Sequence, residues 1–342
     1  MDENQVLCAC SAYEQKFYLN PRYESLPEGI KEELKILSVM LTADVGGVFT
    51  MEFEEDGSLY MSTTAKENDF FYDEIGSYLK IKQMRQEHEE LFSSLEEYYR
   101  AFFAGKEEYK PVIIQTAKSL STRFRPAAGV LQSWDADKGW QAERGWKCPV
   151  IIDNMMNLEL LFEASKLSGD STYYNVAVKH ADTTMKNHFR ANNSCYHVVD
   201  YDPVTGEVRK KQTAQGYADE SAWARGQAWA IYGYTMCYRY THDQKYLDMA
   251  EKIYNFIFNN PNLPEDLVPY WDFDAPNIPN EPRDVSAAAC TASALYELST
   301  YIPDKNYKET ADKIMENLAS PAYRAEVGTN GNFILMHSVG SI

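Results

Sequence analysis

The sequence predicts a mainly α-helical protein, in which a small α+β domain at residues 1–105 precedes an α/α-toroid of helical hairpins at residues 106–342. The charge supports the division. Residues 1–105 hold 21 acidic against 9 basic side chains, a net charge of −12, so the remainder carries only −6 of the total −18. All six tryptophans lie beyond residue 130. The two parts therefore differ in composition as well as in pattern.

A helical hairpin pattern recurs from about residue 85 onwards. An apolar helix, a short polar turn and an amphipathic helix follow one another, and each turn leads to a tyrosine. The turns are "AGKEEY", "SGDSTY", "THDQKY" and "IPDKNY", which end at Tyr109, Tyr173, Tyr246 and Tyr307. Leading helices such as "GQAWAIYGYTMCYRY" are apolar nearly all round, and trailing ones such as "YLDMAEKIYNFIF" carry a charged stripe. This pattern predicts an inner ring of buried helices inside an outer, solvent-facing ring.

The first domain shows helices and one strand pair. "SLPEGIKEELKIL" predicts a helix capped by Ser25, and "GGVFTMEFEEDGSLYMSTTA" predicts two strands around a Glu-Asp-Gly turn. "LKIKQMRQEHEELFSSLEEYYRAFF" predicts one long charged helix. Phrases such as "DVGGVFTMEFEEDG" and "YDEIGSYLKIKQ" resemble a small uncharacterised domain family of Firmicutes, a resemblance that implies no activity.

Composition excludes several classes of function. The net charge of −18 argues against nucleic acid as a partner, because phosphates would be repelled. No apolar run is long enough to span a membrane and no signal peptide is visible, so a cytoplasmic location is expected. The six scattered cysteines are expected to be reduced thiols, and no cofactor or metal ligand cluster is apparent.

Long loops should lead into the inner helices at one mouth of the toroid. These loops are "SWDADKGWQAERGWKCPVIID", "YHVVDYDPVTGEVRKKQTAQGYADESAWARG" and "VPYWDFDAPNIPNEPRDVSAA", and we expect the tryptophans to gather there. Aromatic faces stack on sugar rings while planar polar groups bind hydroxyls, so this composition predicts a carbohydrate site. The alternative for any single tryptophan is a place in the core.

Several motifs resemble one enzyme family. "SWDADKGW", "IIDNMMNLELLFEASKLSGD", "ADESAWARGQAW", "YWDFDAPNIPNEPRDVSAAA" and "FILMHSVGSI" together look like the unsaturated glucuronyl hydrolases, from about residue 106 to 342. The resemblance implies a six-hairpin (α/α)6-barrel, of which this chain has a part, and no metal cofactor. It also implies removal of a 4,5-unsaturated uronic acid from an oligosaccharide, through protonation of C4, addition of water at C5 and opening of the resulting hemiketal.

The resemblance also implies roles for individual residues. The family's acid/base falls on Asp153, and the positions that contact substrate fall on His197, Gln215 and Arg225. Stacking positions fall on Trp134, Trp223 and Trp229. Structural alternatives stay open: His197 as a loop hydrogen bonder, Arg225 as a partner of Asp219 or Glu220, and Asp284 as a helix cap.

Two departures from the family pattern stand out. The family's second Asp, on an earlier inner helix, has no counterpart; the nearest text is "HEELF", where Glu89 is a candidate replacement or part of a solvated helix face. "MHSVGSI" also stops where the family continues. We therefore expect a truncated, fused derivative, either vestigially active or a carbohydrate-binding relic; a homo-oligomer that completes the ring is a third possibility.

Asp153 also has a purely structural interpretation, as a helix cap. It precedes the apolar helix "NMMNLELLF", where it is expected to cap the helix by accepting from the N–H of Met155 or Met156. Burial would raise the pKa of this carboxyl, whereas the positive helix end would lower it.

Overall fold

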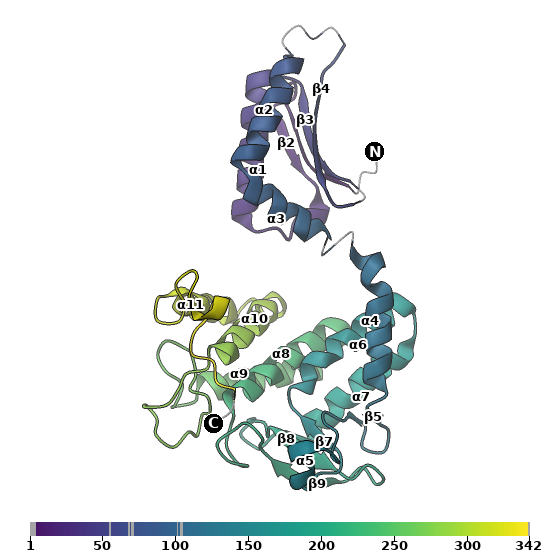
Figure 1. Cartoon of the computed structure of the whole chain (residues 1–342), viewed down its shortest axis with the longest axis vertical. Helices are drawn as coiled ribbons and strands as arrows, with labels where there is room; N and C mark the ends of the chain where they lie inside the picture. The colour runs from purple at the N-terminus through teal and green to yellow at the C-terminus, as the bar shows by residue number, and fades with distance from the viewer. Residues whose placement is uncertain are drawn as a thin grey trace. The chain divides into compact units, whose positions relative to one another are not determined.

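The protein is described by a computed structural model that covers residues 5–54, 56–67, 69, 72–100, 102 and 105–340. The chain forms two compact units, Met1–Pro111 and Val112–Ile342, a few residues beyond the boundary predicted at residue 105 (Figure 1). The helix α4 (Gly105–Ser121) contains the boundary. Within the described ranges, every helix is too short or too polar to cross a membrane.

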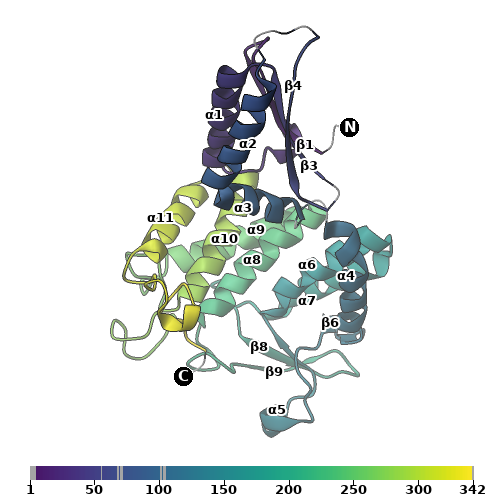
Figure 2. The ribbon, with the colours of Figure 1, turned by 45° about the horizontal axis from the view of Figure 1, so that its top comes forward.

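The first unit is a four-stranded antiparallel sheet covered by helices. The strand order is β2 (Lys16–Leu19), β1 (Val6–Ser11), β3 (Val48–Phe53) and β4 (Leu59–Thr64). The helices α1 (Glu28–Val45) and α2 (Glu74–Glu87) lie side by side on one face of this sheet, and α3 (Glu89–Tyr99) follows (Figures 1 and 2). The predicted strand pair is confirmed as β3 and β4, with Phe49 opposite Thr63.

Three details of this unit differ from the prediction. The strands β1 and β2 were not predicted; Cys8 and Cys10 lie buried on β1 as apolar filler. The capping role of Ser25 is wrong, because α1 begins after Pro27 and the Ser25 hydroxyl bonds the Tyr98 hydroxyl at 2.9 Å. The single charged helix is two, broken at His88. The break lets α3 turn its own apolar face, including Tyr99 stacked on Phe53, onto the core.

The second unit is a partial α/α-barrel of helical hairpins. Three complete hairpins are described: α6 (Asn154–Ser168) with α7 (Ser171–Asn187), α8 (Ala224–Thr241) with α9 (Gln244–Phe258), and α10 (Val285–Tyr301) with α11 (Tyr307–Ala319). The helices α6, α8 and α10 pack in sequence as the inner layer (Figure 1). The predicted first hairpin, which has the turn that ends at Tyr109, is not contained in this unit. Only the part of α4 from Val112 onwards belongs to it.

The recurring turns have a structural reason. Asp170 and Asp243 cap α7 and α9 by accepting from backbone N–H groups two residues on, at 2.8 and 3.1 Å. The tyrosines after the last two turns, Tyr246 and Tyr307, tie neighbouring outer helices together. The Tyr246 hydroxyl donates to Asp182 on α7 at 2.8 Å, and the Tyr307 hydroxyl donates to Glu251 on α9 at 2.9 Å. These two bonds join α7 to α9 and α9 to α11, and so help to set the register of the outer layer.

The segments that precede the inner helices are more ordered than predicted. A three-stranded antiparallel sheet runs in the order β7 (Pro149–Ile151), β8 (Val198–Tyr201) and β9 (Val208–Gln212), so two of the predicted loops contain strands. A short pair, β5 (Phe124–Arg125) and β6 (Val130–Leu131), and a short helix, α5 (Gly139–Glu143), precede it. The sheet fixes the position of the residue that follows β7, which is the start of the candidate site.

Candidate functional site

Asp153 lies between β7 and α6, just before the first residue of this inner helix. The predicted cap is wrong: Asp153 has helical φ and ψ of −55° and −28°, and its side chain caps nothing. Its side chain is 14% exposed, and its Oδ2 atom has no hydrogen-bond partner among the described residues. A buried carboxyl oxygen without a partner is rare in folded proteins and points to a ligand or a chemical role. The carboxyl is therefore available for chemistry.

The environment of Asp153 favours its protonated form. Burial is the dominant effect and raises the pKa of Asp153 to about 6, against opposing effects of its own backbone N–H and of the Arg225 charge. Arg225 is the one charged side chain that contributes to this shift within the described ranges. A carboxyl whose pKa is near 6 is still largely protonated up to about pH 6. It can therefore donate its proton there, as a general acid must.

His197 faces Asp153 with one ring nitrogen and the loop with the other. Its Nδ1 accepts from the backbone N–H groups of Ala214 at 3.1 Å and Gln215 at 3.2 Å. Its Nε2 lies 3.8 Å from Asp153 Oδ2, and no described residue bonds it. Burial lowers the pKa of His197 to about 3, so the ring is neutral. Because Nδ1 accepts, the proton of the neutral ring is assigned to Nε2.

The 3.8 Å separation is too long for a hydrogen bond between Asp153 and His197. Both atoms are buried and neither has a hydrogen-bond partner among the described residues, so both keep unused hydrogen-bonding capacity. Trp223 adds a third such atom, since its buried Nε1 also lacks a partner in the described part of the chain. The ring centroids of Trp223 and His197 are 4.4 Å apart, so these unpartnered groups belong to one site.

Arg225 and Gln215 bond the segment near residue 340. The Arg225 guanidinium donates to Asp284 at 3.1 Å and to the Val339 carbonyl at 2.8 Å, and the Gln215 amide donates to the Gly340 carbonyl at 2.8 Å. The suggested pairing of Arg225 with Asp219 or Glu220 is thus replaced by Asp284. The predicted cap by Asp284 is present as well, because it accepts from Ser286 N at 3.1 Å.

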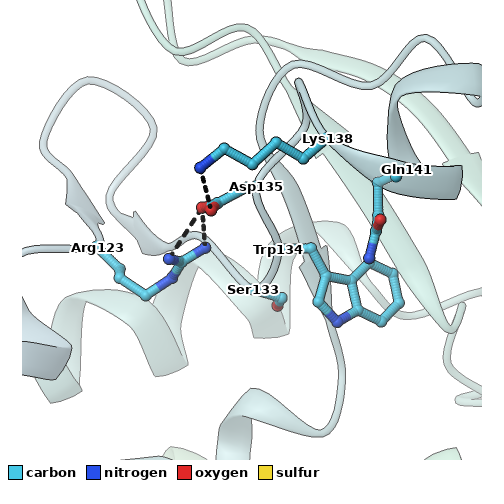
Figure 3. A pocket seen from close by; sticks show the side chains of 7 residues that line it. Arg123, Ser133, Trp134, Asp135, Lys138 and Gln141 are labelled. Carbon is cyan, nitrogen blue, oxygen red and sulfur yellow. Dashed lines mark hydrogen bonds and ion pairs between the residues drawn. The ribbon is translucent and has the colours of Figure 1, made fainter.

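The three predicted stacking tryptophans lie in different surroundings. Trp223 is only 2% exposed, with the Arg225 guanidinium 4.7 Å from its ring centroid, so its face is covered by protein. Trp229 lies inside α8 rather than in a loop, half-buried, with its ring edge-on to Tyr232. Trp134 lies edge-on to His197 at 6.3 Å and lines a pocket with Arg123 and Lys138 (Figure 3). The stacking roles of all three stay predictions.

Two carboxylates that the sequence did not single out, the buried Asp272 and the exposed Asp274, hold the site's loop. Asp272 is fully buried and accepts from the Tyr217 backbone N–H at 2.9 Å and the Ser221 hydroxyl at 2.7 Å. Asp274 accepts from the Ala222 backbone N–H at 2.9 Å. Together they fix the segment that ends at the start of α8. The motif "YWDFDA" contains both, but their partners lie about 50 residues away and only the fold reveals them.

Metal ligation has no candidate in the described part of the chain, where no three His, Cys, Asp or Glu side chains converge in a way that could hold an ion. Two further histidines are buried as neutral rings. Burial lowers the pKa of His180 to about 3 and that of His188 to about 4. His180 accepts from the Leu131 backbone N–H at 3.0 Å, which is a structural role.

Comparison with known proteins places both units. Residues 4–107 match a family of unknown function, DUF6145. The chain is 53% identical over 233 residues to an unsaturated glucuronyl hydrolase of Formosa agariphila, a match that covers 68% of this chain and 57% of that protein. It is 35% identical over 233 residues to an unsaturated chondroitin disaccharide hydrolase of Streptococcus agalactiae, covering 67% and 56%. The chain thus spans somewhat over half the length of these relatives.

Solved structures of unsaturated glucuronyl hydrolases also match this chain. A crystal structure of an unsaturated glucuronyl hydrolase specific for heparin matches with a TM-score of 0.66 and 46% identity, covering 71% of this chain and 63% of that chain. A mutant of the Streptococcus agalactiae enzyme complexed with dGlcA-GalNAc6S matches with a TM-score of 0.56 and 25% identity, covering 92% and 84%. Most of the chain is therefore homologous to the unsaturated glucuronyl hydrolases, and its second unit has part of their (α/α)6-barrel fold.

Proposed function

We propose that this chain is a glycoside hydrolase that releases a 4,5-unsaturated uronic acid from oligosaccharides, with Asp153 as the catalytic acid. The observation that carries the proposal is the buried Asp153 carboxyl, whose Oδ2 has no partner among the described residues and whose pKa is raised to about 6, beside the N–H of a neutral His197. Relatives that share this fold have been crystallised with unsaturated oligosaccharides, dGlcA-Glc-Rha-Glc in one case and dGlcA-GalNAc6S in another. These complexes support the substrate class.

In the proposed mechanism, Asp153 both donates and accepts the protons that the reaction needs. Asp153 protonates C4 of the vinyl ether, and positive charge develops at C5 and the ring oxygen. Water then adds at C5 and gives its proton to the Asp153 carboxylate. His197 does not take that proton, because its Nδ1 is occupied by two backbone donors and its Nε2 already carries hydrogen. Its role is to donate a hydrogen bond to a substrate oxygen or to the water. The hemiketal at C5 then opens and the remaining sugar leaves.

Arg225 is a cation close to both proposed site residues. It lowers the pKa of both Asp153 and His197, and its side chain is 15% exposed. Asp284, which is fully buried, holds the guanidinium in place. A fixed guanidinium next to the acid is suited to attract the carboxylate of a uronate. The substrate would thus enter with its carboxylate toward Arg225 and its double bond toward Asp153.

A carbohydrate-binding relic is the second candidate, and one observation favours it. No second carboxylate among the described residues affects the pKa of Asp153. The candidate replacement, Glu89, lies in the first unit, exposed in the first turn of α3, and its catalytic role stays a prediction. The homo-oligomer and the cytoplasmic location also stay predictions; the mass of the chain in solution tests the first.

Turnover of an unsaturated disaccharide by the purified full chain tests the proposal. Hydrolysis removes the conjugated double bond, so ultraviolet absorbance is expected to fall with time. Because the acid must be protonated, kcat/KM is expected to decline about tenfold per pH unit once the pH exceeds about 6. The His197 pKa of about 3 lies outside this window. Binding of the disaccharide without loss of absorbance at any pH would instead establish the relic.

A further inference from the structure

We propose that the first unit binds a basic amphipathic helix of another protein in the groove between α1 and α2. The groove, here called the α1–α2 groove, has a volume of about 470 Å³. Figures 1 and 2 show the two helices side by side on one face of the sheet. The inference concerns the first unit and does not rest on the proposed hydrolysis at Asp153.

Each helix presents one face to the α1–α2 groove. The lining residues of α1 recur every three or four positions, at Glu33, Ile36, Leu37, Met40, Leu41 and Asp44. Those of α2 recur in the same way, at Lys80, Gln83, Met84 and Glu87. Glu33 and Asp44 are eleven positions apart, which is about three helical turns, or about 16 Å. A helix of about three turns therefore matches the groove in length.

Two ion pairs between the helices close the ends of the groove. The Glu33 carboxylate lies 3.2 Å from His88 Nδ1 at one end, and the Lys80 ammonium group bonds the Asp44 carboxylate at the other. The two pairs show that α1 and α2 run antiparallel. Between them the floor is apolar and includes the buried Met84, whose flexible thioether can adapt to the side chains of a partner.

The wall that α1 contributes is apolar although it is exposed. Ile36 is 57% exposed, Val39 44% and Met40 62%. The helix carries no charged residue between Lys35 and Asp44, while its opposite face is already buried in the core of the unit. A helix at the surface normally has a polar outer face. An exposed apolar stripe at helical spacing therefore marks a surface that binds a partner.

The charge of the groove selects a basic partner. Its lining holds three carboxylates, of Glu33, Asp44 and Glu87, against the one ammonium group of Lys80, a net charge of −2 with His88 counted as neutral. Residues 1–105 carry a net charge of −12. A helix with apolar residues on one face and lysines or arginines beside them would complement both the floor and the rim. A second copy of the chain would bring the same acidic groove, so like charges oppose self-association here.

Binding of a synthetic peptide to the purified full chain tests the inference. The probe is a fluorescein-labelled peptide of about 14 residues, with leucines at helical spacing on one face and lysines elsewhere. One control peptide has the same composition in scrambled order, and another has glutamates in place of the lysines. By fluorescence anisotropy, the amphipathic lysine peptide is expected to bind at least about tenfold more tightly than either control. Added salt should weaken its binding.

Two variants locate the binding in the groove. Ile36→Ser is expected to weaken the Kd about fivefold to tenfold, because an aliphatic contact is lost, and Glu87→Gln about threefold, because one rim charge is lost. Ile75→Ser and Glu97→Gln are the matched controls. Ile75 is 76% exposed on α2 and Glu97 is exposed on α3, and neither lines the groove. Both controls should leave the Kd unchanged, and circular dichroism checks the fold of all four variants.

Several results would overturn the inference. One is a failure of the unchanged chain to bind the amphipathic lysine peptide. Another is equal affinity for the scrambled peptide, because binding would then need charge alone. Equal losses in Ile36→Ser and Ile75→Ser would place the binding outside the groove. A mass in solution that doubles with concentration, and stays that of one chain in Ile36→Ser, would assign the groove to a second copy instead. None of these results depends on whether the chain hydrolyses a sugar.

Discussion

Asp153→Asn is expected to lower kcat for an unsaturated disaccharide by about 10²–10⁴-fold, the usual contribution of a general acid. The substitution keeps the shape of the side chain but removes the proton that C4 must receive. Since Asp153 Oδ2 bonds no described residue, the substitution breaks no observed hydrogen bond of this atom. KM is therefore expected to change much less than kcat, because the amide can still contact the substrate.

Asp312→Asn is the control for this experiment. Asp312 pairs with Lys308 and accepts from the Tyr296 hydroxyl, and none of these residues belongs to the proposed site. It should leave kcat and KM unchanged, and circular dichroism of both variants checks the fold. An Asp153→Asn protein that keeps most of its turnover would remove Asp153 from the mechanism. Strong loss of turnover would exclude the inactive relic, because only an active chain has activity to lose.

Local sequence predicted those parts of the fold that depend on local chemistry. The hairpin turns repeat a tyrosine, and the structure uses it: Tyr246 reaches Asp182 on the neighbouring outer helix, while Asp243 of the same turn caps α9. The helix break at His88 was not predictable in this way. The charged pattern continues through it, and the break serves a core that only the assembled sheet creates.

The candidate site likewise contains features that the sequence predicted and features that only the structure shows. Sequence context singled out Asp153, His197 and Arg225, and the structure brings them together. Their environment came only from tertiary contacts. Asp284, 59 residues after Arg225, turned out to be its partner, and the missing cap at Asp153 depends on backbone angles that no motif specifies. Burial, which raises the pKa of Asp153, likewise comes from packing of distant segments.

Asp153→Asn is also expected to change the stability of the second unit, with a sign that depends on pH. The pKa of Asp153 is raised to about 6 in the folded state, against about 3.9 in an unfolded chain. Relative to the ionised form, the protonated carboxyl favours folding, so its contribution is fully present below pH 3.9 and is lost as the pH rises through about 6. The loss at pH 8 is up to about 3 kcal/mol. Asparagine does not ionise, so the variant should gain stability relative to the unchanged chain as the pH rises.

Urea denaturation at pH values from 4 to 8, followed by tryptophan fluorescence, measures this difference. All six tryptophans lie between residues 134 and 271, so the signal reports unfolding of the second unit alone. The absolute stability of both proteins should fall in acid, because the pKa values of the buried His180 and His188 are lowered and the unfolded chains take up protons there. This loss is common to both proteins, and only the difference between them isolates Asp153.

Asp312→Asn supplies a control of opposite sign. The pKa of Asp312 is lowered, first by its hydrogen bond with Lys308, so the ionised form contributes stability that is lost in acid. Removing that carboxylate should cost stability at pH 8 and less at pH 4, whereas removing Asp153 should do the reverse. A difference between Asp153→Asn and the unchanged chain that is independent of pH would contradict a buried, protonated Asp153. That outcome would remove the physical basis of the acid even if the chain binds sugar, because a carboxyl with an ordinary pKa is already ionised at neutral pH and has no proton to give.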